Sequence, residues 1–181
     1  LPTPTIGAVG LIADADDAIT GLAREGHMAI LIGETNGHLG QSALLSEVFN
    51  RVEGDAPPVD LEAEKKHGEF IRTNSAWITA CSDLSDGGLA LAAFEMAAAA
   101  NVGVSLDTEG TAELFGEDQA RYLVACNFDQ AEALLAAAGN LGVPATCVGR
   151  FGGTQVSFGA QQAELSELSS IFRNSFADAV T

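Results

Sequence analysis

Short apolar runs alternate along this chain with longer segments in which apolar residues recur every three or four positions. The short runs are bounded by glycine or polar residues and predict buried β-strands at 28–32, 77–81, 102–106, 121–126, 145–151 and 155–158. The longer segments predict helices at 39–49, 60–74, 89–100, 128–138 and 163–180. Because Gly152-Gly153-Thr154 favours a tight turn, we expect the last two strands to pair as a hairpin.

Capping residues support several of these helix limits. Asp60 precedes the second helix and can accept hydrogen bonds from its first N–H groups. Asn127 can cap the fourth helix, with Gln130 at the third helical position completing a capping box. Residues typical of helix ends follow the third and fourth helices, namely Asn101, Gly103, Gly142 and Pro144.

Strands mixed with long helices in one chain indicate an α/β (α+β) sandwich with a mixed β-sheet. The 181 residues suit one domain. Pro2 and Pro4 favour an extended backbone, so we expect residues 1–12 to be an interdomain linker and residues 13–181 to be the domain. Since the chain starts at Leu1 rather than Met, we expect it to be part of a longer protein.

The composition argues against several classes of partner. The formal net charge of −17, from 25 acidic and 8 basic residues, repels nucleic acid and excludes a polybasic contact with a membrane; its ordinary consequence is solubility. No run reaches the ~20 apolar residues of a membrane helix, and since no basic segment followed by an apolar run is present, we expect no secretory signal. Cys81, Cys126 and Cys147 have no CxxC spacing, which disfavours disulfides and zinc and suits a reducing cytoplasm.

The segment Ser82-Asp83-Leu84-Ser85-Asp86-Gly87-Gly88-Leu89 joins a predicted strand to a predicted helix. N–H groups at a helix start are unpaired, and Gly87 and Gly88 would let a ligand approach them without a Cβ in the way. This suits an anion or phosphate, although no GK[ST] follows as in a P-loop. Asp86 would repel a bare phosphate unless Mg²⁺ or a sugar hydroxyl intervenes. Alternatively, Ser85 or Asp86 only caps the helix.

A second polar cluster, Gly116-Glu117-Asp118-Gln119-Ala120-Arg121, leads directly into a predicted strand. Glu117 accepts hydrogen bonds, and Gln119 both donates and accepts them, which suits ribose hydroxyls or an amide-bearing ligand. Alternatively, this segment is a solvated start of the strand in which Arg121 pairs with a nearby carboxylate.

A third segment, 33–42, is another glycine-rich loop between a strand and a helix, and Glu34 could face a ligand there or pair locally. His27, His38 and His67 lack the spacing of metal ligands, so we expect ordinary surface roles for them. No serine lies in a GxSxG elbow, and we expect neither a catalytic nucleophile nor a metal centre in this chain.

Together these segments resemble the large subunit of phosphoribosylformylglycinamidine synthase. The resemblance rests on ILIGET at 30–35 with LGQS at 39–42, on DLSDGGLA at 83–90 with EMA at 95–97, and on LFGEDQ at 114–119 with Arg121. It runs in order through nearly the whole chain. The chain departs from the family at Asp118, where serine is usual, and at Ser82, where histidine is frequent.

The resemblance implies an AIR-synthase-related C-terminal fold, of which the large subunit has two copies; the DLSDGGL segment and the final helix are similar to the second copy. It implies purine biosynthesis by an ATP-dependent C–N ligase that amidates formylglycinamide ribonucleotide with ammonia from glutamine. ATP and Mg²⁺ would act in the full-length enzyme. The implied partners are barrel domains of the same chain, a glutaminase subunit and a small PurS-type subunit, in the cytoplasm.

On this basis the chain would form one wall of a substrate or nucleotide cleft and be inactive alone. The candidate binding residues are Glu34, Asp83, Ser85, Asp86, Gly87, Gly88, Glu117, Gln119 and Arg121. The alternatives are a structural or assembly domain without a ligand and the equivalent domain of a related ATP enzyme of the selenophosphate synthetase type. A carboxylate at Asp118 would weaken phosphate binding, which suits an auxiliary or structural role for the second copy.

Overall fold

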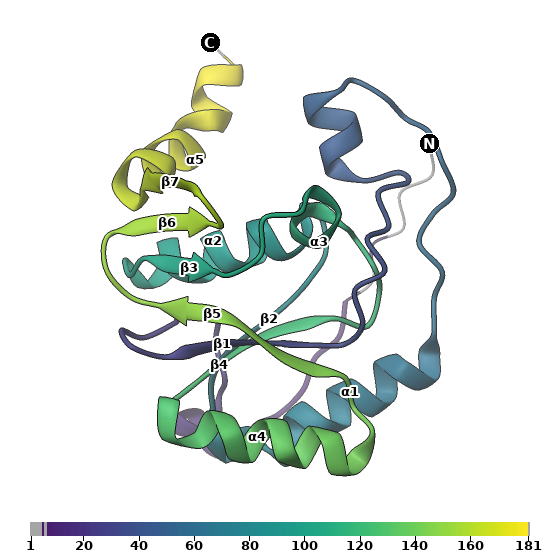
Figure 1. Ribbon diagram of the computed structural model, residues 1–181, viewed down its shortest axis with the longest axis vertical. Coiled ribbons are helices and arrows are strands. Elements are labelled where there is room, and N and C mark those ends of the chain that lie inside the picture. The colour runs from purple at the N-terminus through teal and green to yellow at the C-terminus, as the bar shows by residue number, and fades with distance from the viewer. Residues whose placement is uncertain (1–4, 6, 181) are drawn as a thin grey trace.

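The computed structural model describes residue 5 and residues 7–180, so Pro2 and Pro4, on which the extended linker is predicted, lie outside the described residues. A seven-stranded sheet forms the centre of the described chain (Figure 1). Its strand order is β2 (Ile78–Asp83), β4 (Tyr122–Cys126), β1 (Met28–Ile32), β5 (Ala145–Phe151), β3 (Val104–Leu106), β6 (Gln155–Phe158) and β7 (Gln161–Glu164). Only β3 and β6 pair in parallel among the described strands, which confirms the predicted mixed sheet.

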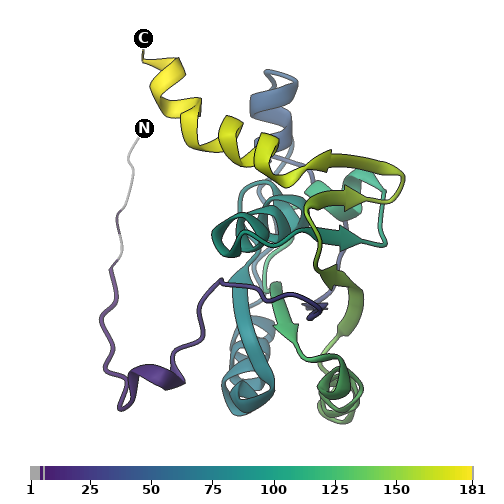
Figure 2. The ribbon, with the colours of Figure 1, turned by 90° about the vertical axis from the view of Figure 1, so that its left-hand side faces the viewer.

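Helices cover both faces of the sheet, as Figures 1 and 2 show. α1 (Leu61–Thr73) and α4 (Phe128–Leu141) lie on one face, while α2 (Gly88–Ala100), α3 (Thr111–Phe115) and α5 (Leu165–Ala179) lie on the other. Side chains of β1 alternate between the two cores: Ala29 and Leu31 pack in the α2 core, whereas Ile30 and Ile32 pack in the α1 and α4 core. The predicted α/β sandwich is therefore confirmed.

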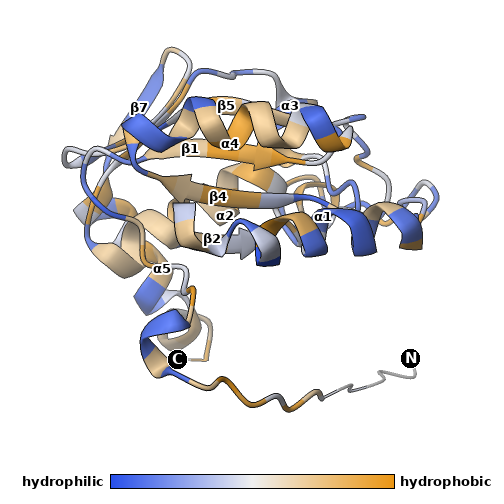
Figure 3. Cartoon of the chain, turned by 90° about the horizontal axis from the view of Figure 1, so that it is seen from below, coloured by the Kyte–Doolittle hydropathy of each residue, from blue (hydrophilic) through white to orange (hydrophobic). Residues whose placement is uncertain are grey.

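The polarity of the elements follows this layering. In Figure 3 the central strands β1 and β4 are largely hydrophobic, whereas α1 and α5 carry hydrophilic residues on their outer faces. Ala29, Ile30, Leu123 and Val124 are fully buried, which is why strands with no polar face are stable here. Among the described residues, no helix is both long enough and apolar enough to cross a membrane.

The predicted hairpin of the last two long strands is wrong. β3 lies between β5 and β6 and pairs with both, Val104 standing opposite Phe151 on one side and Val156 on the other. Gly152 donates to the Gly103 carbonyl at 2.7 Å and Gly103 donates to the Gly153 carbonyl at 2.8 Å. The glycine turn thus passes around the start of β3 instead of closing a hairpin, because the buried Val104 and Leu106 take the inner position.

Other helix and strand limits differ from the predicted ones because of local backbone structure. The predicted helix at 39–49 is reduced to a π-helical turn at Leu44–Val48, because Gln41 has a φ of 57° and its N–H donates to the Glu53 carbonyl. β2 continues through Asp83, so the turn after it is shorter than predicted. β7, α3 and the 3₁₀ turns at Ala15–Asp17 and Ser75–Trp77 are additional elements.

The capping predictions are confirmed at some helix ends and wrong at one. Asp60 accepts from the N–H groups of Glu62 and Ala63, both at 3.0 Å, as predicted. Asn101 and Gly142 adopt left-handed conformations at the ends of α2 and α4. The Asn127 side chain makes no capping bond, and its amide donates to the Gln130 side chain at 3.3 Å.

All three thiols are free. Cys126 is buried, while Cys81 and Cys147 are partly buried. Burial raises the pKa of Cys81 and Cys126 to about 11 each, so both behave as small apolar side chains at neutral pH.

Candidate functional site

The three polar segments meet at one edge of the sheet. β1 and β2 both run antiparallel to β4, so their carboxyl ends lie beside the start of β4. The loop after β1, the turn after β2 and the segment before β4 therefore come together although they are far apart in sequence. The residues between Gly116 and Arg121 supply most of the contacts that join them.

Asp118 binds the first loop through three consecutive backbone amides. Its carboxylate accepts from the N–H groups of Asn36 at 3.2 Å, Gly37 at 3.0 Å and His38 at 3.2 Å. Three adjacent amides that point to one place form a concave anion-binding nest. In this chain the nest is occupied by the buried carboxylate of Asp118, so these amides are not available to an external phosphate.

Glu117 joins the other two segments. One of its carboxylate oxygens accepts from the N–H groups of Ala43 and Gly87, each at 2.8 Å. The Gly88 N–H donates to the Ser85 carbonyl at 3.0 Å. The amides of Gly87 and Gly88, expected from the sequence to face a ligand, are thus both bonded within the chain.

Gly88 is also required for close packing. It has a φ of 59°, and a Cβ at this position would lie 2.4 Å from the Gly116 carbonyl oxygen. Only glycine adopts this conformation while leaving room for that oxygen. The close approach brings the start of α2 against the segment that carries Glu117 and Asp118.

Arg121 lies in the interior of this edge, with its side chain 0% exposed. It donates to the Asp118 carbonyl at 3.2 Å, to the Thr35 hydroxyl at 3.1 Å and to the Gly116 carbonyl. The Asp118 carboxylate is 3.8 Å away. Burial lowers the pKa of Arg121, and Asp118 opposes that change, so the guanidinium remains the cation that balances the buried carboxylate.

Helix α1 fixes the backbone at Ala120, which has a φ of 58° although it is not glycine. Glu64 accepts from the Ala120 N–H at 2.8 Å, and His67 Nδ1 lies 2.8 Å from the Ala120 carbonyl oxygen. The other oxygen of Glu64 accepts from the Tyr122 hydroxyl at 2.8 Å. Burial and the bond to Glu64 raise the pKa of Tyr122 to about 12. The N–H and the carbonyl of the strained Ala120 are therefore both held by side chains from one face of α1.

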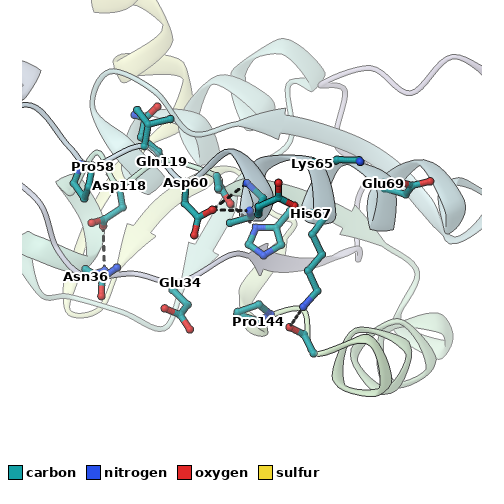
Figure 4. A pocket seen from close by; sticks show the side chains of 16 residues that line it. Glu34, Asn36, Pro58, Asp60, Lys65, His67, Glu69, Asp118, Gln119 and Pro144 are labelled. Carbon is teal, nitrogen blue, oxygen red and sulfur yellow. Dashed lines mark hydrogen bonds between the residues drawn. The ribbon is translucent and has the colours of Figure 1, made fainter.

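Two cavities are lined in part by this turn, since Gln119 and Ala120 border both. A cavity of about 770 Å³ is lined by Glu34, Gln119 and residues of α1 and its N-terminal approach, as Figure 4 shows. A smaller one of about 230 Å³ is lined by Asp83, Ser85, Gln119 and Arg121, among others. Gln119 is exposed and borders both, so it is the predicted residue best placed to contact a ligand in either cavity.

The structure thus separates the predicted residues by environment. Glu34, Asp83, Ser85 and Gln119 reach a cavity, whereas Glu117 is buried in internal hydrogen bonds. Arg121 borders the smaller cavity, but its guanidinium donates its hydrogen bonds to groups of the same chain. Asp86 is exposed and lines neither cavity. Across residues 5 and 7–180, no cluster of three or more metal-binding side chains occurs.

Sequence reasoning missed the contribution of α1. Glu64 and His67 are three positions apart and so share a helix face, a spacing that is visible in the sequence. The prediction of a surface role is wrong for His67, because its side chain packs under the turn at Ala120 and the residue is only 5% exposed. It is also wrong for His27, which is buried with its Nδ1 2.7 Å from the Thr79 hydroxyl. The available signal was a histidine in a polar helix at the position that repeats with Phe70 and Ile71 toward the core.

Comparison with protein families gives a match over most of the chain. The profile of the family described as "AIR synthase related protein, C-terminal domain" matches residues 24–159. Among curated proteins, "Phosphoribosylformylglycinamidine synthase subunit PurL" of Roseobacter denitrificans is 67% identical over 180 residues, and that of Ruegeria sp. (strain TM1040) is also 67% identical over 180 residues. Each match covers 99% of this chain and 25% of the relative, so the chain spans a quarter of their length.

Solved structures share the fold. "T. maritima PurL complexed with FGAR" superposes with a TM-score of 0.71 at 19% identity, covering 86% of this chain and 30% of that one. "T. maritima PurL complexed with ATP" gives 0.66 at 20% identity, and "Structure of PurLQS from Thermotoga maritima" gives 0.65 at 18%; each covers 86% of this chain and 28% of the other. At these identities the superpositions support a shared fold and do not show which ligand this chain binds.

Proposed function

The chain belongs to the AIR synthase related proteins as their C-terminal domain, and on that premise we propose that it is one domain of a phosphoribosylformylglycinamidine synthase large subunit. The observation that carries this proposal is the 67% identity to the Roseobacter denitrificans subunit over 180 residues. The whole enzyme would use ATP to amidate formylglycinamide ribonucleotide with ammonia from glutamine. We further propose residues 1–12 as linker and 13–181 as the domain.

Within that enzyme, the domain would form one wall of a cleft. Gln119 would contact ligand polar groups from the turn that borders both cavities, and Asp83 and Ser85 would do so from the smaller one. Glu117 and Arg121 would act through the backbone they hold. Mg²⁺ is commonly bound by one or two carboxylates plus substrate phosphates, and the exposed Asp83 suits that mode as a single ligand.

The partners follow from the same proposal. The remaining three quarters of the relatives' length would supply the ATP-binding barrel domains, and the glutaminase and the small PurS-type subunit would complete the assembly. For the T. maritima protein, the solved structure of PurLQS supports an assembly of this kind. We expect the complex to be cytoplasmic, as purine biosynthesis is for the resembling enzymes.

A domain exchange tests this proposal. The matching quarter of the Roseobacter denitrificans subunit is replaced by this chain, and ATP- and ammonia-dependent amidation of formylglycinamide ribonucleotide is measured. We expect the exchanged subunit to retain activity, the subunit lacking this quarter to have none, and the isolated chain to have none. Turnover by the isolated chain, or a folded but inactive exchange, would contradict the proposal.

A second candidate function is that of a structural domain without its own ligand. It is favoured by the occupation of the amides of Asn36, Gly37, His38 and Gly87 by carboxylates of the same chain. Titration with ADP–Mg²⁺ and with formylglycinamide ribonucleotide separates the two functions. Shifted NMR signals at Ser85–Gly88 or at Gln119 favour the ligand-binding wall, whereas unchanged signals in a subunit that remains active favour the structural role.

A further inference from the structure

The turn that carries Gln119 has a backbone conformation that its own sequence does not favour. Ala120 has a φ of 58°, in the left-handed region, although it is not glycine. A residue with a Cβ stays in that region only where its surroundings determine the conformation. Ala120 directly follows Gln119, which borders both cavities. The groups that hold Ala120 therefore set the backbone from which the Gln119 side chain extends.

Two side chains of α1 hold both polar groups of Ala120. Glu64 accepts from the Ala120 N–H at 2.8 Å. His67 Nδ1 lies 2.8 Å from the Ala120 carbonyl oxygen and donates to it, because a carbonyl oxygen only accepts. Glu64 borders the smaller cavity and His67 the larger one. One face of α1 thus reaches the turn from the side of each cavity.

The partners of this contact are themselves restricted. The second carboxylate oxygen of Glu64 accepts from the Tyr122 hydroxyl at 2.8 Å, so the carboxylate is bonded at both oxygens. The Ala120 carbonyl also lies against the end of β1, where a Cβ on Gly33, at a φ of 100°, would be 2.4 Å from its oxygen. The Ala120 carbonyl is therefore enclosed between α1 and β1, which leaves one direction for the turn.

The side chain of Gln119 remains available to a ligand. It is exposed, and its one hydrogen bond to the described part of the chain is donated to the Glu117 carbonyl at 3.4 Å. Its side-chain oxygen and its second N–H can therefore bond a ligand. A side chain that is already oriented binds more tightly than one that must be ordered on binding. The orientation of this turn consequently bears on affinity.

We propose that Glu64 and His67 are positioning residues of the binding wall. By holding Ala120 in its left-handed conformation, they fix Gln119 in the orientation in which it meets a ligand. This inference rests on the proposed function, because it takes Gln119 as a ligand contact of the large subunit. The effect of both residues on ligand binding passes through Gln119.

The conformation of Ala120 in the 181-residue chain tests the first step. Its Cα and Cβ chemical shifts report whether the residue is left-handed. Glu64→Ala and His67→Ala should each move these shifts away from left-handed values. Glu64→Gln keeps an acceptor for the N–H, and His67→Asn keeps a donor for the carbonyl, so both should retain them.

A control and a milder variant keep this test decisive. Glu132→Ala removes an exposed carboxylate from α4 and should leave the Ala120 shifts unchanged. Tyr122→Phe removes only the hydroxyl that orients Glu64, and it replaces Glu64→Ala if that variant does not fold. It should move the shifts in the same direction by a smaller amount. Left-handed shifts retained in Tyr122→Phe and in a folded Glu64→Ala overturn the inference.

Kinetics of the exchanged Roseobacter denitrificans subunit test the second step. Gln119→Ala should raise the KM for either formylglycinamide ribonucleotide or ATP about three- to tenfold, which identifies the substrate that Gln119 contacts. Glu64→Ala and His67→Ala should raise the same KM about three- to tenfold and change kcat less than about twofold, and Glu64→Gln should restore it. Added to Gln119→Ala, they should raise KM less than about twofold further, since they act through that residue.

The outcomes separate the inference from the proposed function. An exchanged subunit that is folded but inactive contradicts the synthase role and, with it, the ligand that Gln119 would meet. An active subunit in which Gln119→Ala changes neither KM overturns the inference alone. The same holds if Glu64→Ala raises KM equally with and without Gln119→Ala, because the effect would then not pass through Gln119.

Discussion

Asp118→Ala is the substitution that most directly tests how the candidate site is held together. The carboxylate accepts from three amides at 3.0 to 3.2 Å and lies 3.8 Å from a fully buried guanidinium. A hydrogen bond to a charged group contributes ~1.5–3 kcal/mol, but three bonds to one carboxylate are not additive. Removal of one partner from a buried ion pair costs ~3–5 kcal/mol, and we take this as the expected loss.

Urea unfolding followed by circular dichroism measures that loss, and thermal unfolding should show a midpoint lower by about 6–20 °C. Asp118→Asn keeps one acceptor oxygen and should lose about half as much. Asp86→Ala is the matched control, because Asp86 is exposed and should change the free energy of unfolding by less than ~0.5 kcal/mol. A loss below ~1 kcal/mol for Asp118→Ala would refute the view that this carboxylate organises the loop.

Three further predictions follow from single positions. Gly88→Ala should cost more than ~2 kcal/mol in urea unfolding because its Cβ would lie 2.4 Å from a carbonyl oxygen, whereas Gly139→Ala, on an open helix face, should gain ~0.5–1 kcal/mol; equal effects would contradict the packing argument. Ala120→Gly should leave stability unchanged or raise it by up to ~1 kcal/mol, since Ala120 is left-handed at a φ of 58°, and a marked loss would show that its Cβ matters more than its strain. Burial, with Arg24 nearby, lowers the pKa of His27 below its ordinary 6.5, so stability should be full above that value and fall as pH drops through it toward the folded pKa; thermal midpoints from about pH 8 to 5 should show this fall, and His27→Gln should reduce it.

Much of the fold was predictable because it follows local hydrophobic pattern. β1, β5 and β6 have the limits that their apolar runs predict, and α2 begins one residue early. The pairing of strands was not predictable in the same way. The insertion of β3 between β5 and β6 depends on burial of Val104 and Leu106 beside strands about fifty positions away, and a glycine turn can serve a hairpin or a crossing equally well.

The candidate site, too, was predictable in its local features and not in its long-range contacts. Glycine-rich loops at strand ends were visible in the sequence, and the meeting of three such loops follows from the strand directions. The partners of their amides were not visible, since Asp118 reaches residues 80 to 82 positions earlier. A carboxylate near such loops could equally have faced solvent, a metal or a ligand; only its burial against Arg121 decides the matter.

The same carboxylates define what the edge can still bind. With Asp118 on the nest and Glu117 on Gly87, the strongest anion-binding groups of these loops are neutralised internally. The exposed side chains that remain at the larger cavity include the Glu34 carboxylate and the Gln119 amide. A site built in this way disfavours phosphate by its charge, because a phosphate would meet carboxylates where it needs free amides. The net charge of −17 also disfavours the binding of anions over the whole surface.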